Sequence, residues 1–586
     1  MKNRQRLSSF ALLLWLYVVA AAPISAAPAL EIQVEKNVAV PMRDGTILRA
    51  DVYRPTTGGP YPVLVSRSPY GKPGGMSHAK AGYIVVCQVT RGRYESDGVY
   101  ESFVRADTNE ARDGYDTVEW AAKLPGSTGK VGTFGASYNS YVQWKLAALR
   151  PPSLVVMSAH SIPATMHELE GPGGIRPGRR LNWWYRTMSP DMRKRVNGEK
   201  PHSRADAAKL WTAGRHEELM WFLPWVDLPD AMFGHEAKAV KDWLRNPISD
   251  PWRLPECCPE IAVPNFDVVG WFDHCNGSIG LHRKMVAEGK TEIARRRQRL
   301  VIGPWSHTGR GGTKVGEIDF GADARFNVRG EEIRWFDYWL KGNPNGIDKE
   351  PSVRIFVMGR NKWRSEQEWP LKRETRRKFF LSGNGSANTP SGNGSLIVDR
   401  PGARNAKDTY AYDPSDPVPT LWDHRQFTVP ADQKPLEKRR DILVYQTEPL
   451  KRPLEVTGYP KVTIHASSSA SDTDFFARLI DVSPDGVARD ISMGMVRASK
   501  RNGIARNELL DPGESTQFVI TLNPTSNLFK PGHRIRLDIT SSDFPNFDRH
   551  HNTAGNQNTD ARLVVARQTV HHGPKFQSHL DLPVIP

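Results

Sequence analysis

The sequence predicts an α/β domain that is interrupted by a helical segment and followed by an all-β domain. Residues 38–160 alternate short apolar β-rich runs with helical patterns, which is typical of a sheet covered by helices. Residues 162–259 carry helical patterns without strong strands, and beyond Pro351 the helical patterns disappear. At 586 residues with 39% hydrophobic content, the chain is long enough for two or three separate cores.

Residues 1–27 have the composition of a secretory signal peptide. Basic residues up to Arg6 precede an apolar stretch over 10–22, and small residues lead to Ala27. The apolar stretch is shorter than the roughly 20 residues of a transmembrane helix, and no later apolar run is long enough. We expect cleavage near Ala27, no integral membrane segment in the mature chain, and a secreted or periplasmic protein. An uncleaved anchor or a buried helix is the alternative.

Residues 28–161 form the first part of the predicted α/β domain. Strands are expected where apolar and β-branched residues run together, and helices where apolar residues recur every three or four positions. The predicted strands are 62–65, 83–87, 130–134 and 154–157. The predicted helices lie around 115–122 and over 138–149. This order argues for a sheet with helical connections.

Residues 162–260 are rich in Trp, Met and Arg and predict a helical cap over the ligand-binding edge of the sheet. Strand character returns after the cap, so residues 261–350 are predicted to complete the α/β domain. The predicted segments are helices at 210–222 and 236–244, strands at 265–269 and 299–302, and a helix around 331–340. The α/β domain is therefore expected to be split by its cap.

Residues 351–586 predict an antiparallel β-sandwich, because short alternating strands replace the helices. The predicted strands are 352–358, 377–381, 442–445, 461–466, 475–482, 517–522 and 534–540. A tract rich in Gly, Asn and Ser at 382–395 lies between two of them. It predicts a flexible hairpin loop, not a domain linker.

The formal charge of +16 does not indicate a nucleic-acid partner. Basic runs such as 193–195 and 295–297 are scattered and lack interleaved aromatic residues, so a solvated basic surface is favoured. The four cysteines show no zinc-site spacing, and no metal or organic cofactor is expected. Export allows a disulfide from Cys275 to Cys257 or Cys258, but the sequence does not choose between a bridge and buried thiols. The oligomeric state stays open.

A serine preceded by a glycine turn, Ser137, lies where a predicted strand meets a predicted helix. The segment from Gly132 to Tyr138 has the context of a nucleophile elbow, in which a sharp turn lifts the hydroxyl above the sheet. The helix N-terminus would add positive potential and a backbone donor. Asn139 and Ser140 depart from the G-x-S-x-G form, so a serine that only caps the helix is the alternative.

A serine nucleophile needs a base, and the base needs an orienting carboxylate. Asp273 ends one predicted strand segment and His307 follows the next. With Ser137 they give the chain order Ser, Asp, His that an α/β-hydrolase arrangement requires. His160 and His274 are weaker candidates for the base, since the first precedes the acid and the second is its neighbour.

Motifs along the chain carry a specific resemblance. They lie at 66–72, 90–98, 113–120, 135–138, 270–273, 303–307, 452–458 and 529–537. Together they resemble the cocaine-esterase and X-prolyl dipeptidyl-peptidase (peptidase S15-like, CocE/NonD) superfamily, from Val38 to nearly Pro586. The resemblance implies an α/β-hydrolase domain with an inserted helical cap and a C-terminal all-β jelly roll.

The same resemblance implies the roles of five residues. Ser137 would be the nucleophile, Asp273 the orienting acid and His307 the base, while the Tyr70 phenol and the Tyr138 backbone N–H would bind the oxyanion. Such a site splits ester or amide bonds of small molecules through an acyl-enzyme, without a metal or cofactor.

The substrate class is the least determined feature. Relatives that hold an α-ammonium carry acidic residues after the triad Asp, whereas residues 274–276 here are His, Cys and Asn, so neutral esters are expected. Glu168 and Glu170 could supply carboxylates instead, which keeps dipeptidyl-peptidase, acylase and α-amino-acid ester hydrolase activities as alternatives. A non-catalytic protein that binds an envelope glycan is the alternative from another class.

Cap tryptophans suggest an apolar or aromatic acyl pocket. Packing within the cap explains them as well. They are Trp183, Trp184, Trp211, Trp221 and Trp225.

Overall fold

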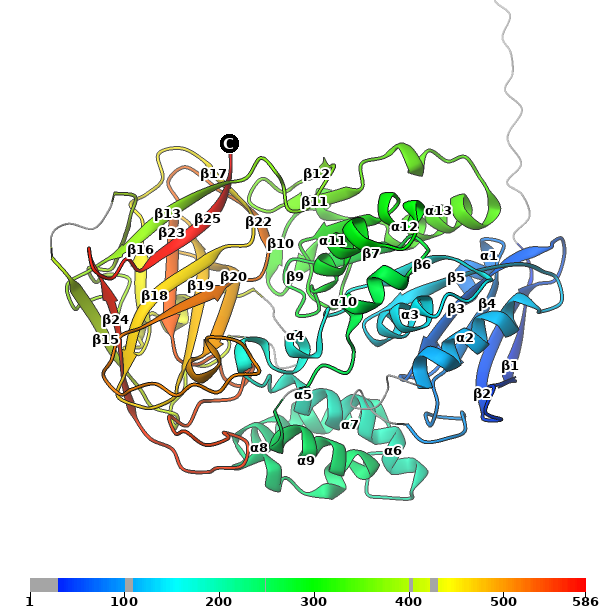
Figure 1. Ribbon diagram of the computed structural model, residues 1–586, viewed down its shortest axis with the longest axis horizontal. Coiled ribbons are helices and arrows are strands. Elements are labelled where there is room, and N and C mark those ends of the chain that lie inside the picture. Colours follow the sequence, from blue (N-terminus) through cyan, green and yellow to red (C-terminus); the bar gives the residue numbers. More distant parts are fainter. Residues whose placement is uncertain (1–29, 101–108, 248, 400–403, 422–429) are drawn as a thin grey trace, which may run out of the picture.

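The computed structural model describes residues 30–100, 109–247, 249–399, 404–421 and 430–586 (Figure 1). The predicted signal peptide therefore lies outside the described residues. Within the described ranges, no helix combines the length and the apolar character needed to cross a membrane. An α/β part and an all-β part stand side by side, with cap helices along one side of both.

The first part of the α/β sheet has six strands in the order β1-β2-β4-β3-β5-β6. Strands β3 to β6 pair in parallel, and β1 and β2 add an antiparallel edge. The strands are β1 (Ile32–Pro41), β2 (Ile47–Pro55), β3 (Tyr61–Ser68), β4 (Ile84–Val89), β5 (Ser127–Ala136) and β6 (Leu154–His160). The four strands predicted in this region are confirmed.

Four further strands continue the sheet beyond β6. They are β7 (Phe266–Gly270), β8 (Arg299–Gly303), β11 (Val353–Val357) and β12 (Lys362–Glu366), in the order β7-β8-β11-β12. The junction with β6 is a parallel bridge from Met157 to Asn265. The Asn265 side chain reinforces it by accepting the Ala159 N–H at 2.8 Å and donating to the Ala159 carbonyl at 3.1 Å. The cap is thus inserted between neighbouring strands without breaking the sheet.

The strand predicted at 352–358 belongs to the α/β sheet, which corrects its assignment to the β-sandwich. Strand β11 pairs in parallel with β8, from Val353 opposite Leu300 to Ile355 opposite Ile302. An alternating apolar strand has the same pattern in either sheet, and only its pairing partner distinguishes them.

Helices cover both faces of the α/β sheet, so its strands are apolar on both sides. On β3, Val63 and Val65 pack into the core that contains Val142, while Leu64 between them packs into the core that contains Phe336. Each such buried side chain contributes about 1.5–3 kcal/mol of transfer free energy. The covering helices are α2 (Asn109–Ala122) and α3 (Tyr138–Ala148) on one face, and α1 (Met76–Lys80) and α13 (Val328–Lys341) on the other. Two more helices follow β7: α11 (Ser278–Glu288) packs beside β7 and β8, and α12 (Glu292–Arg296) packs against α11.

The predicted helical cap is confirmed, with one break. The helix predicted at 210–222 is interrupted at Gly214, whose φ of 125° does not fit a helix. The cap helices are α4 (Met166–Glu170), α5 (Arg179–Asn182), α6 (Ser189–Arg195), α7 (Arg204–Leu210), α8 (His216–Trp221), α9 (Ala237–Arg245) and α10 (Leu254–Cys257). The cap also touches the β domain, where Trp221 packs edge-on against Phe544 at 4.7 Å between ring centroids.

The C-terminal domain is an all-β jelly roll around one large apolar core, as predicted. Its strands pair antiparallel apart from a short parallel contact between β14 and β16. They are β13 (Thr375–Ser382), β14 (Ser395–Ile397), β15 (Ala406–Tyr412), β16 (Leu443–Gln446), β17 (Leu454–Gly458), β18 (Lys461–Ser468), β19 (Asp474–Val482), β20 (Ala488–Arg497), β21 (Thr516–Thr521), β22 (Thr525–Phe529), β23 (Arg534–Thr540), β24 (Ala566–His572) and β25 (His579–Ile585). The Gly-, Asn- and Ser-rich tract joins β13 to β14, with Ser382 opposite Ser395, so the predicted hairpin is confirmed.

No disulfide joins the four cysteines, all of which lie in the described part of the chain. Cys87, Cys258 and Cys275 are buried thiols, and Cys257 is partly buried. Of the two possibilities left by the sequence, the structure has thiols.

Candidate active site

Ser137 occupies a strained turn between β5 and α3. Its backbone angles are φ 60° and ψ −127°, a conformation that residues other than glycine rarely adopt. Its N–H donates to the His160 carbonyl on β6 at 3.0 Å, and its own carbonyl accepts the Tyr141 N–H at 3.0 Å. Gly135 is required just before it, because a Cβ there would lie 2.6 Å from the Cβ of Asn139. The turn has the geometry of a nucleophile elbow.

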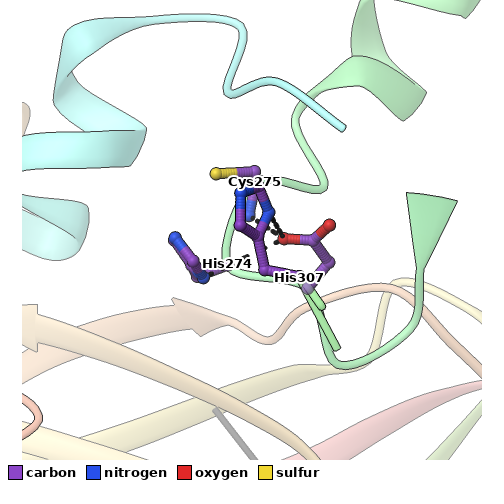
Figure 2. A group of neighbouring side chains, drawn as sticks. His274, Cys275 and His307 are labelled. Carbon is purple, nitrogen blue, oxygen red and sulfur yellow. Dashed lines mark hydrogen bonds and ion pairs between the residues drawn. The ribbon is translucent and has the colours of Figure 1, made fainter. Parts of the chain in front are cut away.

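Asp273 and His307 meet above the carboxyl ends of β7 and β8. The two loops are held together by the Phe272 N–H, which donates to the Trp305 carbonyl at 3.0 Å. The Nδ1 atom of His307 lies 2.8 Å from Oδ1 of Asp273, and the Cys275 N–H donates to the same oxygen at 2.7 Å (Figure 2). Asp273 is only 1% exposed. The carboxylate therefore fixes the orientation of the imidazole.

The local electrostatics of this pair favour a negatively charged Asp273 beside a positively charged His307. Burial alone would raise the pKa of Asp273, but the adjacent His307 holds it below the ordinary value. Burial alone would lower the pKa of His307, but the Asp273 carboxylate raises it above that of a free imidazole. Asp273 is thus placed to stabilise the positive charge of a protonated His307.

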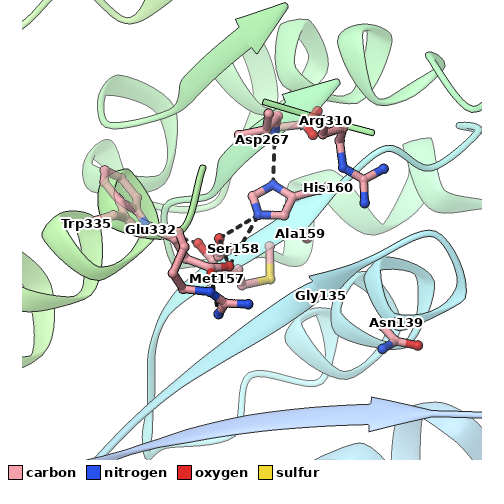
Figure 3. Close-up of polar contacts among 12 residues, drawn as sticks. Gly135, Asn139, Met157, Ser158, Ala159, His160, Asp267, Arg310, Glu332 and Trp335 are labelled. Atoms are coloured by element: carbon pink, nitrogen blue, oxygen red, sulfur yellow. Dashed lines mark hydrogen bonds and ion pairs between the residues drawn. The ribbon is translucent and has the colours of Figure 1, made fainter. Parts of the chain in front are cut away.

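The other two candidate bases occupy different positions. His160 is engaged at both ring nitrogens: Nδ1 accepts the Val268 N–H at 3.0 Å, and Nε2 lies 3.0 Å from Ser158 Oγ and 3.3 Å from Glu332 Oε1 (Figure 3). Through these hydrogen bonds His160 links β6 to β7 and to α13. His274 lies beside His307, but burial, with the nearby positive charges, lowers its pKa well below the ordinary value.

A cavity of about 210 Å³ lies above the elbow. Ser137, Tyr138, His307 and Tyr70 all line it, and Asp273 lies behind His307. The structure thus brings together the five residues that the sequence singled out. The cap and neighbouring loops complete the lining with Ile162, Pro163, Leu169, Arg179, Arg180, Trp183, Thr187, Arg204, Trp252, His274 and Cys275.

Tyr70 is arranged as a hydrogen-bond donor. Its phenol oxygen accepts the indole N–H of Trp183 at 3.2 Å, and because an indole can only donate, the phenol proton is left for another acceptor. Burial raises the pKa of Tyr70, which keeps that proton in place. Its ring packs edge-on against Tyr138 at 6.2 Å between centroids. The first amide of α3 belongs to Tyr138, where the helix dipole also favours negative charge.

The sequence did not anticipate that arginines line the cavity and carboxylates do not. Among the described residues, the lining includes three guanidinium groups, of Arg179, Arg180 and Arg204, and no Asp or Glu. Glu170 is engaged by Arg180 at 2.6 Å, and Glu168 accepts the Ala164 N–H at 2.7 Å instead. Neither glutamate lines the cavity that contains Ser137, and Glu168 lines a larger cavity next to it. The arginine-rich composition of the cap was the available signal.

The tryptophans of the cap divide by role. Of the five noted in the sequence, only Trp183 lines the cavity, together with Trp252, which sequence reasoning missed. Trp184, Trp211 and Trp225 are buried in the core of the cap. Packing within the cap is the main role of these residues.

One group of side chains near the site has the donors for a metal ion. The ligand atoms of Asp273, His274, Cys275 and His307 lie within 4.8 Å of one another. Thiolate and imidazole suit soft cations such as zinc. A cation held there would occupy the Asp273–His307 pair, so it would compete with the predicted role of His307 as a base.

Comparisons with known proteins agree with this geometry. The sequence-family model for X-Pro dipeptidyl-peptidase (S15 family) matches residues 44–309. The family model for the X-Pro dipeptidyl-peptidase C-terminal non-catalytic domain matches residues 345–581. Cocaine esterase of Rhodococcus sp. (strain MB1 Bresler) is 34% identical over 591 residues, which cover 94% of this chain and 98% of that protein.

Two solved structures share the fold over nearly their whole length. An aminopeptidase from a marine sediment Thaumarchaeota archaeon and an α-amino acid ester hydrolase each give a TM-score of 0.73 at 23% identity, covering 97% of this chain and 99% of the other. The α/β-hydrolase fold with a C-terminal β domain is thereby shown. Because the match to cocaine esterase covers nearly the whole of both chains and the S15 family model also matches, this chain belongs to the S15 family of serine hydrolases.

Proposed function

We propose that this protein is an exported carboxylesterase with Ser137 as nucleophile, His307 as base and Asp273 as orienting acid. One observation carries the proposal: the strained Ser137 elbow and the Asp273-bound His307 line the same cavity, beside Tyr70. The similarity to cocaine esterase supports ester bonds as the target. Family membership favours an enzyme over the glycan-binding alternative.

The chemistry follows from these positions. His307 takes the proton of Ser137, and the alkoxide attacks the ester carbonyl to give a tetrahedral oxyanion. The Tyr70 phenol and the Tyr138 N–H bind that oxyanion, and His307 then protonates the departing alcohol. Water, deprotonated by the same imidazole, attacks the acyl-enzyme and releases the carboxylic acid and free Ser137. No step needs a metal or cofactor.

The cavity disfavours substrates with an α-ammonium group. Burying an ammonium beside Arg179, Arg180 and Arg204 adds like-charge repulsion to the cost of desolvation. A dipeptidyl-peptidase or amino-acid ester hydrolase needs carboxylates to offset that cost, and no described Asp or Glu lines the cavity that contains Ser137, although Glu168 lines the larger cavity next to it. The alternatives suggested by the family name are therefore less well supported than ester hydrolysis.

A pair of esters tests this preference. We expect the phenyl ester of phenylacetic acid to be hydrolysed with a kcat/KM at least about tenfold above that of the phenylglycine ester, because one unfavourable charge contact costs about 1.4 kcal/mol or more. The mandelic ester is the matched control, since a hydroxyl replaces the ammonium at similar size. A faster rate for the phenylglycine ester than for the mandelic ester would overturn the preference.

The pH dependence tests the role of His307. Only the neutral imidazole acts as a base, and the Asp273 carboxylate raises the pKa of His307. Activity should therefore be present above that raised pKa and lost as the pH falls through it. We expect the acid limb of log(kcat/KM) against pH, measured with phenyl acetate, to have its midpoint above the 6.5 of an ordinary imidazole. A midpoint below 6.5, with activity recovered on return to pH 8, contradicts this arrangement.

We propose export from the order of charge, apolar stretch and small residues over positions 1–27. The N-terminal sequence of the protein recovered from an exporting host tests it. A start near Pro28 supports cleavage after Ala27, and an intact Met1 contradicts it.

A further inference from the structure

Arg179 is a buried cation whose donors are not satisfied within the described chain. It begins α5 and is 3% exposed, and its Nε and Nη1 atoms have no hydrogen-bond partner. It forms no ion pair with a described residue. Burial lowers the pKa of Arg179 to about 10, which still leaves the guanidinium charged at neutral pH. A charged donor left in this state is costly unless something else pairs with it.

Its neighbour in sequence shows the contrast. Arg180 has a carboxylate partner, Glu170, at 2.6 Å, and stacks on Trp183 with 4.1 Å between the guanidinium carbon and the ring centroid. Among the described residues, the Arg179 guanidinium contacts the face of Phe547, with 5.4 Å from its carbon to the ring centroid. The other acid close by, Asp273, is committed to His307. The chain therefore balances the charge of Arg180 and leaves that of Arg179 for a partner from outside.

Arg179 lies where two cavities meet. It lines the cavity of about 210 Å³ that contains Ser137, and it also lines a larger cavity of about 950 Å³ between the cap, the α/β domain and the jelly roll. Of the other described residues, only His274 lines both cavities, and its lowered pKa leaves it neutral. A substrate bound at Ser137 and extending into the larger cavity must pass this guanidinium.

We propose that Arg179 binds an anionic group of the substrate, so that the preferred substrates are esters that carry a carboxylate. The inference rests on the proposed esterase function and names its substrate class. A carboxylate accepts two parallel N–H bonds from a guanidinium and neutralises its charge. The carboxylate can belong to the acyl group or to the leaving alcohol, and the geometry serves both.

Two pairs of esters test the proposal in the full-length mature enzyme. Monophenyl glutarate against phenyl glutaramate places the charge on the acyl side, and 4-acetoxybenzoate against 4-acetoxybenzamide places it on the leaving group. Each kcat/KM is divided by the uncatalysed rate at the same pH. We expect the carboxylate to be preferred about 10- to 100-fold in one pair, which then identifies the side. No preference in either pair overturns the proposal.

Variants assign the preference to Arg179. Arg179→Met should lower kcat/KM for the carboxylate ester at least about tenfold more than for its neutral partner, and Arg179→Lys should keep part of the preference. Arg186→Met is the matched control, since this half-buried cap arginine does not line the cavity. An equal loss for charged and neutral esters in Arg179→Met would show a merely structural role and overturn the assignment.

A measurement on the unaltered enzyme covers the case in which the variant does not fold. Glutarate should inhibit phenyl acetate hydrolysis at least about tenfold more strongly than the neutral glutaramide. Equal inhibition overturns the proposal. Failure of the esterase function itself looks different, since phenyl acetate turnover and fluorophosphonate labelling of Ser137 would then be absent whatever Arg179 does.

Discussion

Ser137→Ala is expected to abolish turnover and leave the protein folded. The hydroxyl is the proposed covalent centre, and removing such a nucleophile costs on the order of 10⁶-fold in kcat. The fold does not depend on it, because the contacts that hold the elbow are made by the backbone N–H and carbonyl of Ser137. Steady-state kinetics with phenyl acetate measures the loss, and circular dichroism with a thermal melt monitors the fold.

Ser140→Ala provides the matched control for that experiment. Ser140 is a buried serine in the first turn of α3, three residues beyond Ser137, and does not line the cavity. Its alanine variant should keep near-normal activity and react with a fluorophosphonate probe, whereas Ser137→Ala should not react. Activity of Ser137→Ala above about one part in a thousand of normal, or labelling elsewhere, removes Ser137 from the nucleophile role.

Tyr70→Phe is expected to lower kcat about 10²- to 10³-fold while changing KM much less. Losing one oxyanion donor costs about 3 kcal/mol of barrier. The effect falls on kcat because the phenol proton, left over after Trp183 donates to the oxygen, finds its strongest acceptor only when the oxyanion forms. Separate kcat and KM values for phenyl acetate provide the test.

Tyr185→Phe is the control for the lost phenol. Tyr185 is a buried cap tyrosine that does not line the cavity, so its variant should keep kcat within about twofold. The kcat of Trp183→Phe should lie between those of Tyr70→Phe and Tyr185→Phe, because this variant keeps an aromatic ring but removes the N–H that donates to the Tyr70 oxygen. An unchanged kcat in Tyr70→Phe excludes Tyr70 from the oxyanion site.

Local patterns in the sequence predicted the α/β order and the candidate triad. An elbow needs only a strand, a glycine turn and a helix in succession, so Ser137 could be found within seven residues of sequence. Asp273 and His307 could be found because the carboxyl ends of parallel strands meet at one edge of a sheet. These are consequences of chain order and of short-range backbone geometry.

Tertiary structure decided the features that depend on which distant segments meet. Strand β11 pairs with β8, which the sequence of Val353–Val357 does not reveal, because a strand pattern does not specify the strand it pairs with. The expected carboxylate of Glu170 is taken by Arg180 from the next turns of the cap. Which charges are balanced and which are left for a ligand depends on contacts across the folded chain.

The sequence by itself thus predicted the order of elements, the cap and the candidate residues of a serine hydrolase site, because each shows as a residue pattern over a short stretch of the chain. Only the folded chain decided that the cavity is cationic. Arg179 and Arg180 are adjacent and have the same side chain. They differ because Arg180 pairs with Glu170, whereas Arg179 contacts Phe547 and lines the cavity. Charge balance in a buried site is a property of three-dimensional neighbours, and linear spacing does not specify them.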